Sequence, residues 1–321
     1  MSRLFLAPME GLVDEVMRAT LTEAAPYDAC VTEFARVAGS ALPAKFFTRI
    51  APELHTRSRT AAGTPVKVQL LGSDPGRLAE SALTLAQLAP AGIDLNFGCP
   101  APTVNRHRGG AVLLDEPELL HRILLAVRAA VPPSMPVTAK MRLGMRDTSR
   151  ALEAACALAD GGAGELVVHA RTKEDGYRPP AHWPWIARIA EAVSVPVIAN
   201  GEVWTLDDYR RCRSESGRCD VMLGRGAVAD PFLVERIRAA QAGAVVRSHD
   251  EDWSRLHPLI ERFWARVLDK VEPRHAPGRL KQWLNLLRRH YAQAGLLYDA
   301  IRPLRDPAAV SNVLQQAVVL A

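Results

Sequence analysis

Residues 92–100, Gly-Ile-Asp-Leu-Asn-Phe-Gly-Cys-Pro, join a short run of strand-forming residues to a loop that contains glycine, cysteine and proline. Seven further strand-like runs occur along the chain, with helical patterning between them. The eight predicted strands are residues 4–7, 29–33, 66–71, 92–96, 137–141, 165–169, 195–199 and 220–223. The predicted helices include residues 77–88, 117–131, 148–160, 183–192 and 205–214.

This alternation of strands and helices is typical of βα units around a parallel sheet. Eight such units over about 240 residues match the size of a (β/α)8 TIM barrel. A doubly wound sheet is the alternative. It rarely needs eight parallel strands, however, and the fingerprint Gly-x-Gly-x-x-Gly is absent after the first strand. We therefore predict an α/β fold of the TIM-barrel class.

Polar residues and glycines lie at the ends of nearly all the predicted strands. A barrel brings these carboxyl ends to one face, where the active sites of this fold lie. The residues concerned are Pro8, Met9, Glu10, Gln69, Asn96, Cys99, Lys140, Arg142, His169, Arg171, Asn200, Gly201, Glu202, Gly224, Arg225 and Gly226. The sequence thus predicts a site at this face.

The strand rhythm stops after Gln241. Residues 243–252 are rich in Gly, Ser and Asp and indicate a linker, after which we predict helices at 253–270, 279–294 and 307–320. In the middle helix Leu280, Leu284, Leu287 and Tyr291 form one apolar stripe, and Lys281, Asn285, Arg288 and Arg289 lie on the flank facing away from it. The predicted domains are a barrel, residues 1–242, and a small helical bundle, residues 243–321.

Basic residues are concentrated in the predicted bundle. Residues 245–321 contain 12 Lys and Arg and 8 acids, a net charge of +4 out of +5 for the whole chain. This asymmetry indicates a surface that faces a polyanion. A solvated helix face explains the charge alone equally well.

The five cysteines form no Cys-x-x-Cys pair and no cluster with zinc-ligand spacing, so we expect reduced thiols and no metal. The chain shows no signal peptide and no run of 18 apolar residues, and we expect a cytoplasmic monomer without a membrane span.

Three strand ends suggest a phosphate site and an anion site. The glycines of Asn200-Gly201-Glu202 and Gly224-Arg225-Gly226 allow backbone N–H groups to approach phosphate oxygens after strands seven and eight, although each could be a simple turn. Lys140 in the barrel mouth needs an anion or a strong acceptor, such as a reduced flavin. An internal salt bridge for Lys140 and a satisfied core role for His169 are the alternatives.

Cys99 follows a strand and is expected on a loop rather than in a core. A thiol with a pKa of about 8.5 is mostly protonated at neutral pH and can act as a general acid. Residues 101–110, with Arg106, His107 and Arg108, suit a mobile basic lid over a nucleic acid. By residue type alone, a structural cysteine is the simpler interpretation.

Eight motifs together resemble the tRNA-dihydrouridine synthases, in order from Leu4 to about Leu233. They are residues 7–11 (Ala-Pro-Met-Glu-Gly), 32–34 (Thr-Glu-Phe), 68–70 (Val-Gln-Leu), 94–100 (Asp-Leu-Asn-Phe-Gly-Cys-Pro), 140–144 (Lys-Met-Arg-Leu-Gly), 168–172 (Val-His-Ala-Arg-Thr), 198–202 (Ile-Ala-Asn-Gly-Glu) and 222–226 (Met-Leu-Gly-Arg-Gly). The resemblance implies FMN in the mouth of a (β/α)8 barrel and a helical domain that grips tRNA.

The resemblance also assigns roles to residues of this chain. It implies that Cys99 donates a proton to C5 of uracil and that Asn96 holds the base over the flavin. The cofactor-binding residues would be Ala7, Pro8, Met9, Gln69, Lys140, His169, Asn200, Gly201, Glu202, Gly224 and Arg225. The tRNA-binding residues would be Arg36, Asn96, Arg171, Tyr177, Arg279, Lys281 and Arg288.

The implied reaction is reduction of FMN by NADPH, followed by hydride transfer from FMN to C6 of uridine while Cys99 protonates C5. Residues 8–14, 33–37 and 279–284 are most similar to the C-type bacterial subgroup, which implies uridine 16 of the D-loop as the target. The sequence differs from that subgroup at Phe97 and at residues 106–108. The difference at residues 106–108 affects the RNA contacts expected for the lid. The base must be extruded from its stack to react.

Two alternatives stay open. A flavin barrel could reduce a free pyrimidine or another small unsaturated substrate, which would leave the basic helical tail without a purpose. A protein of another class, a non-catalytic RNA-binding protein, would lack bound flavin.

Overall fold

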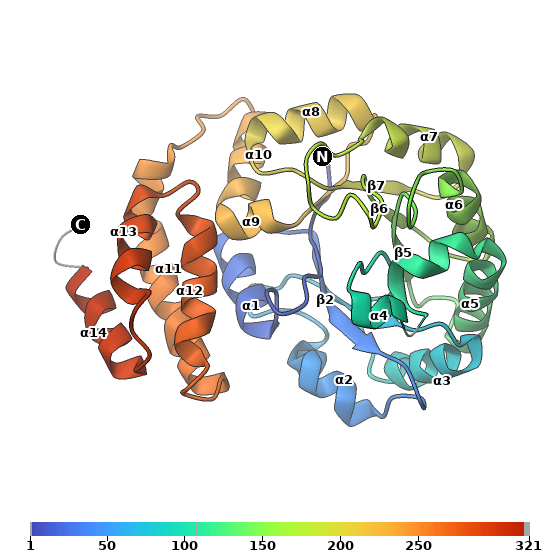
Figure 1. Ribbon diagram of the computed structural model, residues 1–321, viewed down its shortest axis with the longest axis horizontal. Coiled ribbons are helices and arrows are strands. Elements are labelled where there is room, and N and C mark those ends of the chain that lie inside the picture. The colour runs from blue at the N-terminus through green and yellow to red at the C-terminus, as the bar shows by residue number, and fades with distance from the viewer. Residues whose placement is uncertain (1, 107, 318–321) are drawn as a thin grey trace. The chain divides into compact units, whose positions relative to one another are not determined.

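The chain forms a closed barrel of eight parallel strands in the order β1-β2-β3-β4-β5-β6-β7-β8, with β1 paired to β8 (Figure 1). The computed structural model describes residues 2–106 and 108–317. The strands are β1 Leu4–Leu6, β2 Ala29–Arg36, β3 Val66–Leu71, β4 Ile93–Phe97, β5 Val137–Arg142, β6 Leu166–His169, β7 Val197–Asn200 and β8 Val221–Leu223. The predicted (β/α)8 TIM barrel is confirmed.

Helices follow the strands as the sequence predicts. Those up to β8 are α1 Glu15–Ala24, α2 Ala44–Ile50, α3 Pro75–Ala86, α4 Pro102–Arg106, α5 Pro117–Ala130, α6 Ala151–Asp160, α7 Pro184–Ala192 and α8 Leu206–Ser216, with short 3-10 helices η1 Pro52–Thr56 and η2 Gly110–Asp115. After β8 come α9 Arg225–Ala229, α10 Leu233–Gln241, α11 His249–Lys270, α12 Ala276–Leu287, α13 Ala292–Ile301 and α14 Pro307–Ala317.

Alternate side chains of the strands fill the barrel interior. One layer is apolar and consists of Phe5, Ala7, Ala29, Val31, Val167, Ile198 and Met222. Toward the amino ends of the strands, Arg3 forms ion pairs with Glu165 and Asp220.

Strand register sets the polar residues of the carboxyl ends side by side. Asn96 on β4 is paired with Lys140 on β5, and His169 on β6 is paired with Asn200 on β7. Neighbouring strands therefore contribute adjacent polar side chains, as expected for the functional face of this fold.

The residues group into two compact units. The barrel unit contains residues 2–15, 27–203 and 207–224, and the helical unit contains residues 16–26, 204–206 and the described chain from 225 onward. No helix in the described chain is long and apolar enough to cross a membrane.

The helical unit differs from the sequence prediction at two places. The linker is shorter than residues 243–252, because Ser248 caps α11 in a reciprocal capping box with Glu251 and the helix begins at His249. The predicted single helix 279–294 is wrong: α12 ends at Leu287 and α13 begins at Ala292.

The break has a physical cause. Tyr291 adopts an extended conformation as the N-cap of α13, and its buried hydroxyl lies 2.7 Å from a carboxylate oxygen of Asp230. The apolar stripe is nevertheless buried as expected, since Leu280, Leu284 and Leu287 have no exposed surface. The predicted end of the last helix at residue 320 lies outside the described residues.

Candidate active site at the carboxyl ends of the barrel strands

The loop after β4 is held by the side chain of Asn96. Its Oδ1 atom accepts hydrogen bonds from the backbone N–H groups of Gly98 and Cys99, each at 2.9 Å. On the other side of the loop, the Asn105 amide donates to the Cys99 carbonyl at 2.9 Å. These bonds fix the backbone from which the thiol projects.

Cys99 is only 9% exposed and packs against Leu71 and Val104, with Phe34 and Ala101 at the edge of the cluster. The expectation that this cysteine lies outside a core is therefore wrong, because the loop is covered by its apolar neighbours. Burial raises the pKa of the Cys99 thiol. The sulfur is thus kept protonated, as a proton donor requires.

The segment after Cys99, predicted as a basic lid, contains the short helix α4 and then η2. Arg108 forms a two-pronged ion pair with Glu116 at 2.7 and 2.8 Å. His107 lies outside the described residues. One of the three basic side chains of this segment is therefore already paired within the protein.

A buried hydrogen-bond chain supports the Cys99 loop. Asp94 accepts from Gln69 and from Thr138, each at 2.6 Å, and the Gln69 carbonyl oxygen accepts from Asn96 at 2.7 Å. Burial raises the pKa of Asp94, against the lowering effect of these hydrogen bonds. The chain connects β3, β4 and β5 and fixes the orientation of both amides.

Lys140 is half-buried beside these hydrogen-bonded residues. Within the part of the chain that the structure describes, its ammonium makes no hydrogen bond or ion pair. Burial and the nearby charge of Arg142 lower the pKa of Lys140 to about 8, although Asp94 and Cys99 act in the opposite direction. A partly buried cation of this kind favours binding of an anion or a strong acceptor.

Arg142 is a site residue whose role the sequence did not indicate. Its guanidinium is buried and donates to the Gly98 carbonyl at 2.8 Å, and to the carbonyls of Thr172 and Gly176 at 2.8 and 2.9 Å. It also lies 5.2 Å from the ring centre of Tyr177. Arg142 therefore joins the cysteine loop to the loop after β6. The sequence feature that could have indicated this role is the position of Arg142 at the carboxyl end of a strand.

Arg171 and the partly exposed Glu202 form an ion pair beside His169. Arg171 has no exposed surface, and its second terminal nitrogen lies 3.4 Å from the His169 Nε2 atom. The structure thus places Arg171, expected near RNA, inside the protein. Tyr177, also expected near RNA, is 53% exposed, and its ring centre lies 6.1 Å from that of His169.

The turn after β7 has no room for a side chain at Gly201. Its φ angle is +116°, and a Cβ atom there would lie 2.8 Å from the His169 ring. The Trp183 indole donates to the Gly201 carbonyl at 2.9 Å, and Asn200 donates to the Met222 carbonyl at 2.8 Å. The exposed backbone of this turn is the kind of cradle that phosphate uses.

The remaining predicted cofactor residues lie at the ends of β1 and β8. Ala7 donates to the Leu223 carbonyl at 2.9 Å, Pro8 and Met9 follow it, and Gly224 lies close to the Met9 sulfur. Arg225 begins α9 in the helical unit, and its guanidinium lies 5.0 Å from the Trp204 ring centre.

The predicted tRNA residues belong to both units. Arg36 ends β2 in the barrel unit, whereas Arg279, Lys281 and Arg288 belong to α12 and its C-cap. Lys281 donates to the Leu304 carbonyl, Arg279 donates to Gln282, and the Arg288 guanidinium lies 4.6 Å from the Tyr298 ring centre. Across residues 2–106 and 108–317, no cluster of three or more His, Cys, Asp or Glu side chains could hold a metal ion.

Solved structures share the barrel fold at low sequence identity. Histamine dehydrogenase from Rhizobium sp. 4-9 superposes with a TM-score of 0.57 at 15% identity, covering 75% of this chain and 46% of that chain. Morphinone reductase, solved with tetrahydroNAD, gives a TM-score of 0.52 at 13% identity, covering 76% and 88%. These similarities establish the fold alone.

Sequence relatives are much more similar. The tRNA-dihydrouridine(16) synthase of Ralstonia nicotianae is 56% identical over 318 residues, 99% of this chain and 97% of its own length. That of Shewanella oneidensis is 45% identical, covering 98% of each chain. The dihydrouridine synthase (Dus) profile matches residues 5–306. Because the profile and these relatives match almost the whole chain, the chain belongs to the dihydrouridine synthase family.

Proposed function

We propose that this protein is an oxidoreductase that reduces the C5–C6 double bond of a uridine in tRNA to 5,6-dihydrouridine, at position 16 of the D-loop. The observation that carries the proposal is the placement of the buried Cys99 thiol, on the loop after β4, and of Lys140, on the neighbouring strand β5, at the same end of the barrel. The names of the relatives from Ralstonia nicotianae and Shewanella oneidensis support uridine 16 as the target.

The cofactor is FMN, and NADPH is its reductant. Bound flavin supplies a hydride for C6 of the base. Lys140 would hold the flavin ring through its ammonium, and the turn at Gly201, which has no side chain, would hold the phosphate. The other residues that hold the cofactor are Ala7, Pro8, Met9, Gln69, His169, Asn200, Glu202 and Gly224, with Arg225 next in the chain.

The protein's own residues perform the proton transfer. Cys99 donates its proton to C5, and Asn96 and Arg142 position it through the loop that they hold on two sides. Glu202 acts through Arg171, because their ion pair orients the guanidinium that contacts the His169 ring. Tyr177 offers an exposed ring on which an extruded base can stack.

The pH dependence of flavin binding tests the role of Lys140. Below about pH 8 the Lys140 ammonium is charged in the free protein, so flavin affinity is at its maximum, and it falls as the pH rises above that value. Lys140→Met is expected to lower the affinity about tenfold at neutral pH and to remove this dependence. Titration of the flavin-free protein from pH 6 to about pH 9.5 measures both effects. An unchanged pH dependence in the variant contradicts the assignment.

Residues 243–321 form the tRNA-binding domain in this proposal. Replacing Lys281 and Arg288 with Gln is expected to weaken tRNA binding and to flatten log K against log salt by about 1 per lost phosphate contact. Arg122→Gln, which removes an exposed charge on α5, is the matched control and should leave the salt slope unchanged. Equal slopes of log K against log salt for all the proteins would show that Lys281 and Arg288 on α12 and its C-cap do not contact tRNA phosphates.

The activity is tested by mapping dihydrouridine in tRNA from cells that lack this protein. We expect uridine at position 16 in place of dihydrouridine and restoration of the modification by the purified flavoprotein with NADPH. Loss at another position would overturn the target. Equal rates on free uracil and tRNA would favour a small-molecule reductase, and a colourless protein without turnover would favour a non-catalytic RNA-binding protein.

A further inference from the structure

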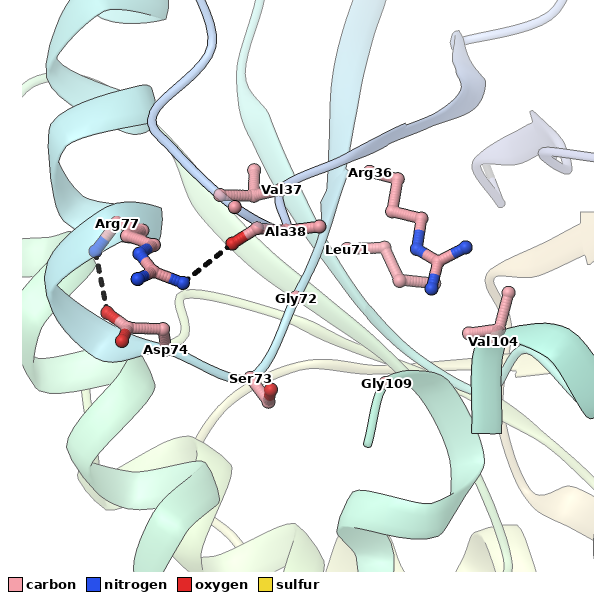
Figure 2. Close-up of a pocket in the computed structure, with 11 residues that line it drawn as sticks. Arg36, Val37, Ala38, Leu71, Gly72, Ser73, Asp74, Arg77, Val104 and Gly109 are labelled. Atoms are coloured by element: carbon pink, nitrogen blue, oxygen red, sulfur yellow. Dashed lines mark hydrogen bonds between the residues drawn. The ribbon is translucent and has the colours of Figure 1, made fainter. Parts of the chain in front are cut away.

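A pocket lies beside the Cys99 loop, between the ends of β2 and β3 and the start of α3 (Figure 2). Its volume is about 290 Å³, and the residues that matter below are Arg36, Leu71, Gly72, Asp74, Arg77 and Val104. All of them belong to the barrel unit. The residues assigned to the flavin and the uracil are absent from its walls.

The pocket shares a wall with the site of the proton donor. Leu71 and Val104 line the pocket and also pack against Cys99. A group bound in the pocket is therefore separated from the thiol by the thickness of one layer of side chains. This separation suits a neighbour of the reacting base along the same RNA strand.

Two guanidinium groups give the pocket its charge. Arg36 makes no hydrogen bond or ion pair with any residue in the described ranges, and Arg77 uses one terminal nitrogen to donate to the Ala38 carbonyl at 2.8 Å. Figure 2 shows the two side chains on opposite sides of the pocket. The Asp74 carboxylate accepts from the backbone N–H of Arg77 at 2.9 Å and caps α3, and its negative charge offsets one of the two guanidinium charges. The lining of the pocket therefore has a net charge of +1, and its guanidinium N–H groups can donate to an anion.

The size of the pocket limits its occupant. A volume of about 290 Å³ lies just below the range for ligand pockets, roughly 300–1,000 Å³. A Cβ atom at Gly72 would lie 2.8 Å from the Val37 carbonyl oxygen, and one at Gly109 would lie 3.0 Å from the Leu71 side chain. The backbone at these two glycines therefore packs too closely against its neighbours to leave room for a side chain. One nucleotide fits these limits better than a dinucleotide.

We propose that this pocket binds the nucleotide next to the target uridine in tRNA, with its phosphate between Arg36 and Arg77. The inference rests on the proposed function, because a base that reaches Cys99 must leave its stack and carry its neighbours' phosphates to the protein surface. Arginine is suited to this contact, since its planar guanidinium binds phosphate and stacks on bases.

The experiment combines variants of the protein with altered tRNA. Two tRNAs carry a single uncharged methylphosphonate linkage, on the 5′ or the 3′ side of uridine 16. Binding of each tRNA and of the unaltered tRNA is measured with the flavin-loaded wild type, Arg36→Gln, Arg77→Gln and the control Arg122→Gln. Flavin absorbance and melting temperature verify the fold of each protein.

With the wild type, one of the two linkages is expected to weaken binding about fivefold. With Arg36→Gln or Arg77→Gln that loss should disappear, because the partner of the phosphate is already gone, whereas Arg122→Gln should retain it. If each methylphosphonate linkage weakened tRNA binding by Arg36→Gln and Arg77→Gln as much as it weakens binding by the wild type, the pocket assignment would be overturned. Binding is measured without turnover, so failure of the proposed reduction would be seen separately as absence of dihydrouridine with the wild type.

Discussion

Cys99→Ala is expected to lower the rate of dihydrouridine formation about 10²- to 10⁴-fold, the range that a positioned general acid contributes. The Asn96 and Arg142 contacts to the loop involve backbone groups, so the loop and the flavin site should survive the substitution. Single-turnover reduction of unmodified tRNA by the pre-reduced protein measures the proton-transfer step. Flavin content and oxidation of NADPH report on the rest of the site.

Burial raises the pKa of the Cys99 thiol, so the proton donor stays protonated through neutral pH and is lost only as the pH rises above the raised value. The rate with the wild type should therefore hold through neutral pH and fall on the alkaline side. Cys212→Ala is the matched control, because Cys212 is a buried thiol on α8. A Cys99→Ala protein that turns over as fast as the Cys212→Ala protein would remove Cys99 from the mechanism.

The second large effect concerns stability and Asp230. This carboxylate is 1% exposed and accepts from the Arg236 guanidinium at 2.8 Å, from the Tyr291 hydroxyl at 2.7 Å and from the His249 ring at 3.2 Å. Arg236 also donates to Asp252 at 2.6 Å. All five residues belong to the helical unit. Asp230 thus satisfies several buried donors at once.

Asp230→Ala is expected to lower the free energy of unfolding by about 3–5 kcal/mol, because it leaves part of the Arg236 charge buried without its partner. Urea unfolding followed by tryptophan fluorescence measures the loss, since Trp253, Trp264 and Trp283 lie in this unit. Asp299→Ala removes an exposed carboxylate from α13 and is the control. Equal stability of the two variants would show that the network contributes little.

The same network predicts a pH dependence. Burial by itself would raise the pKa of Asp230, but hydrogen bonds from His249 and Tyr291 and the charge of Arg236 lower it below the ordinary value. A carboxyl group whose pKa is lowered in the folded state stabilises the protein above its unfolded pKa of about 3.9. This contribution is lost as the pH falls through the folded value. Asp230→Ala should therefore flatten the acid side of the stability profile.

The sequence determined the barrel and the chemical groups at its mouth. The strand that ends at Asn96 and Cys99 could be predicted because alternating side chains and turn residues are local signals. A turn at Gly201 could be predicted for the same reason, and its φ angle of +116° is one that favours glycine. The order of the strands followed from their number and spacing.

Only the tertiary structure decided which of these groups neutralise one another. Arg171 and Glu202 lie 31 positions apart in the chain, and Gln69 and Asp94 lie 25 apart, so no local pattern could pair them. Tyr291 fits the apolar stripe in the sequence. In the structure it lies between α12 and α13, and its hydroxyl donates to the distant Asp230. Charge pairing and hydrogen bonding depend on distances of a few ångströms across strands and helices. The same dependence on distance leaves the Lys140 ammonium near Cys99 without a hydrogen-bond or ion-pair partner among the described residues.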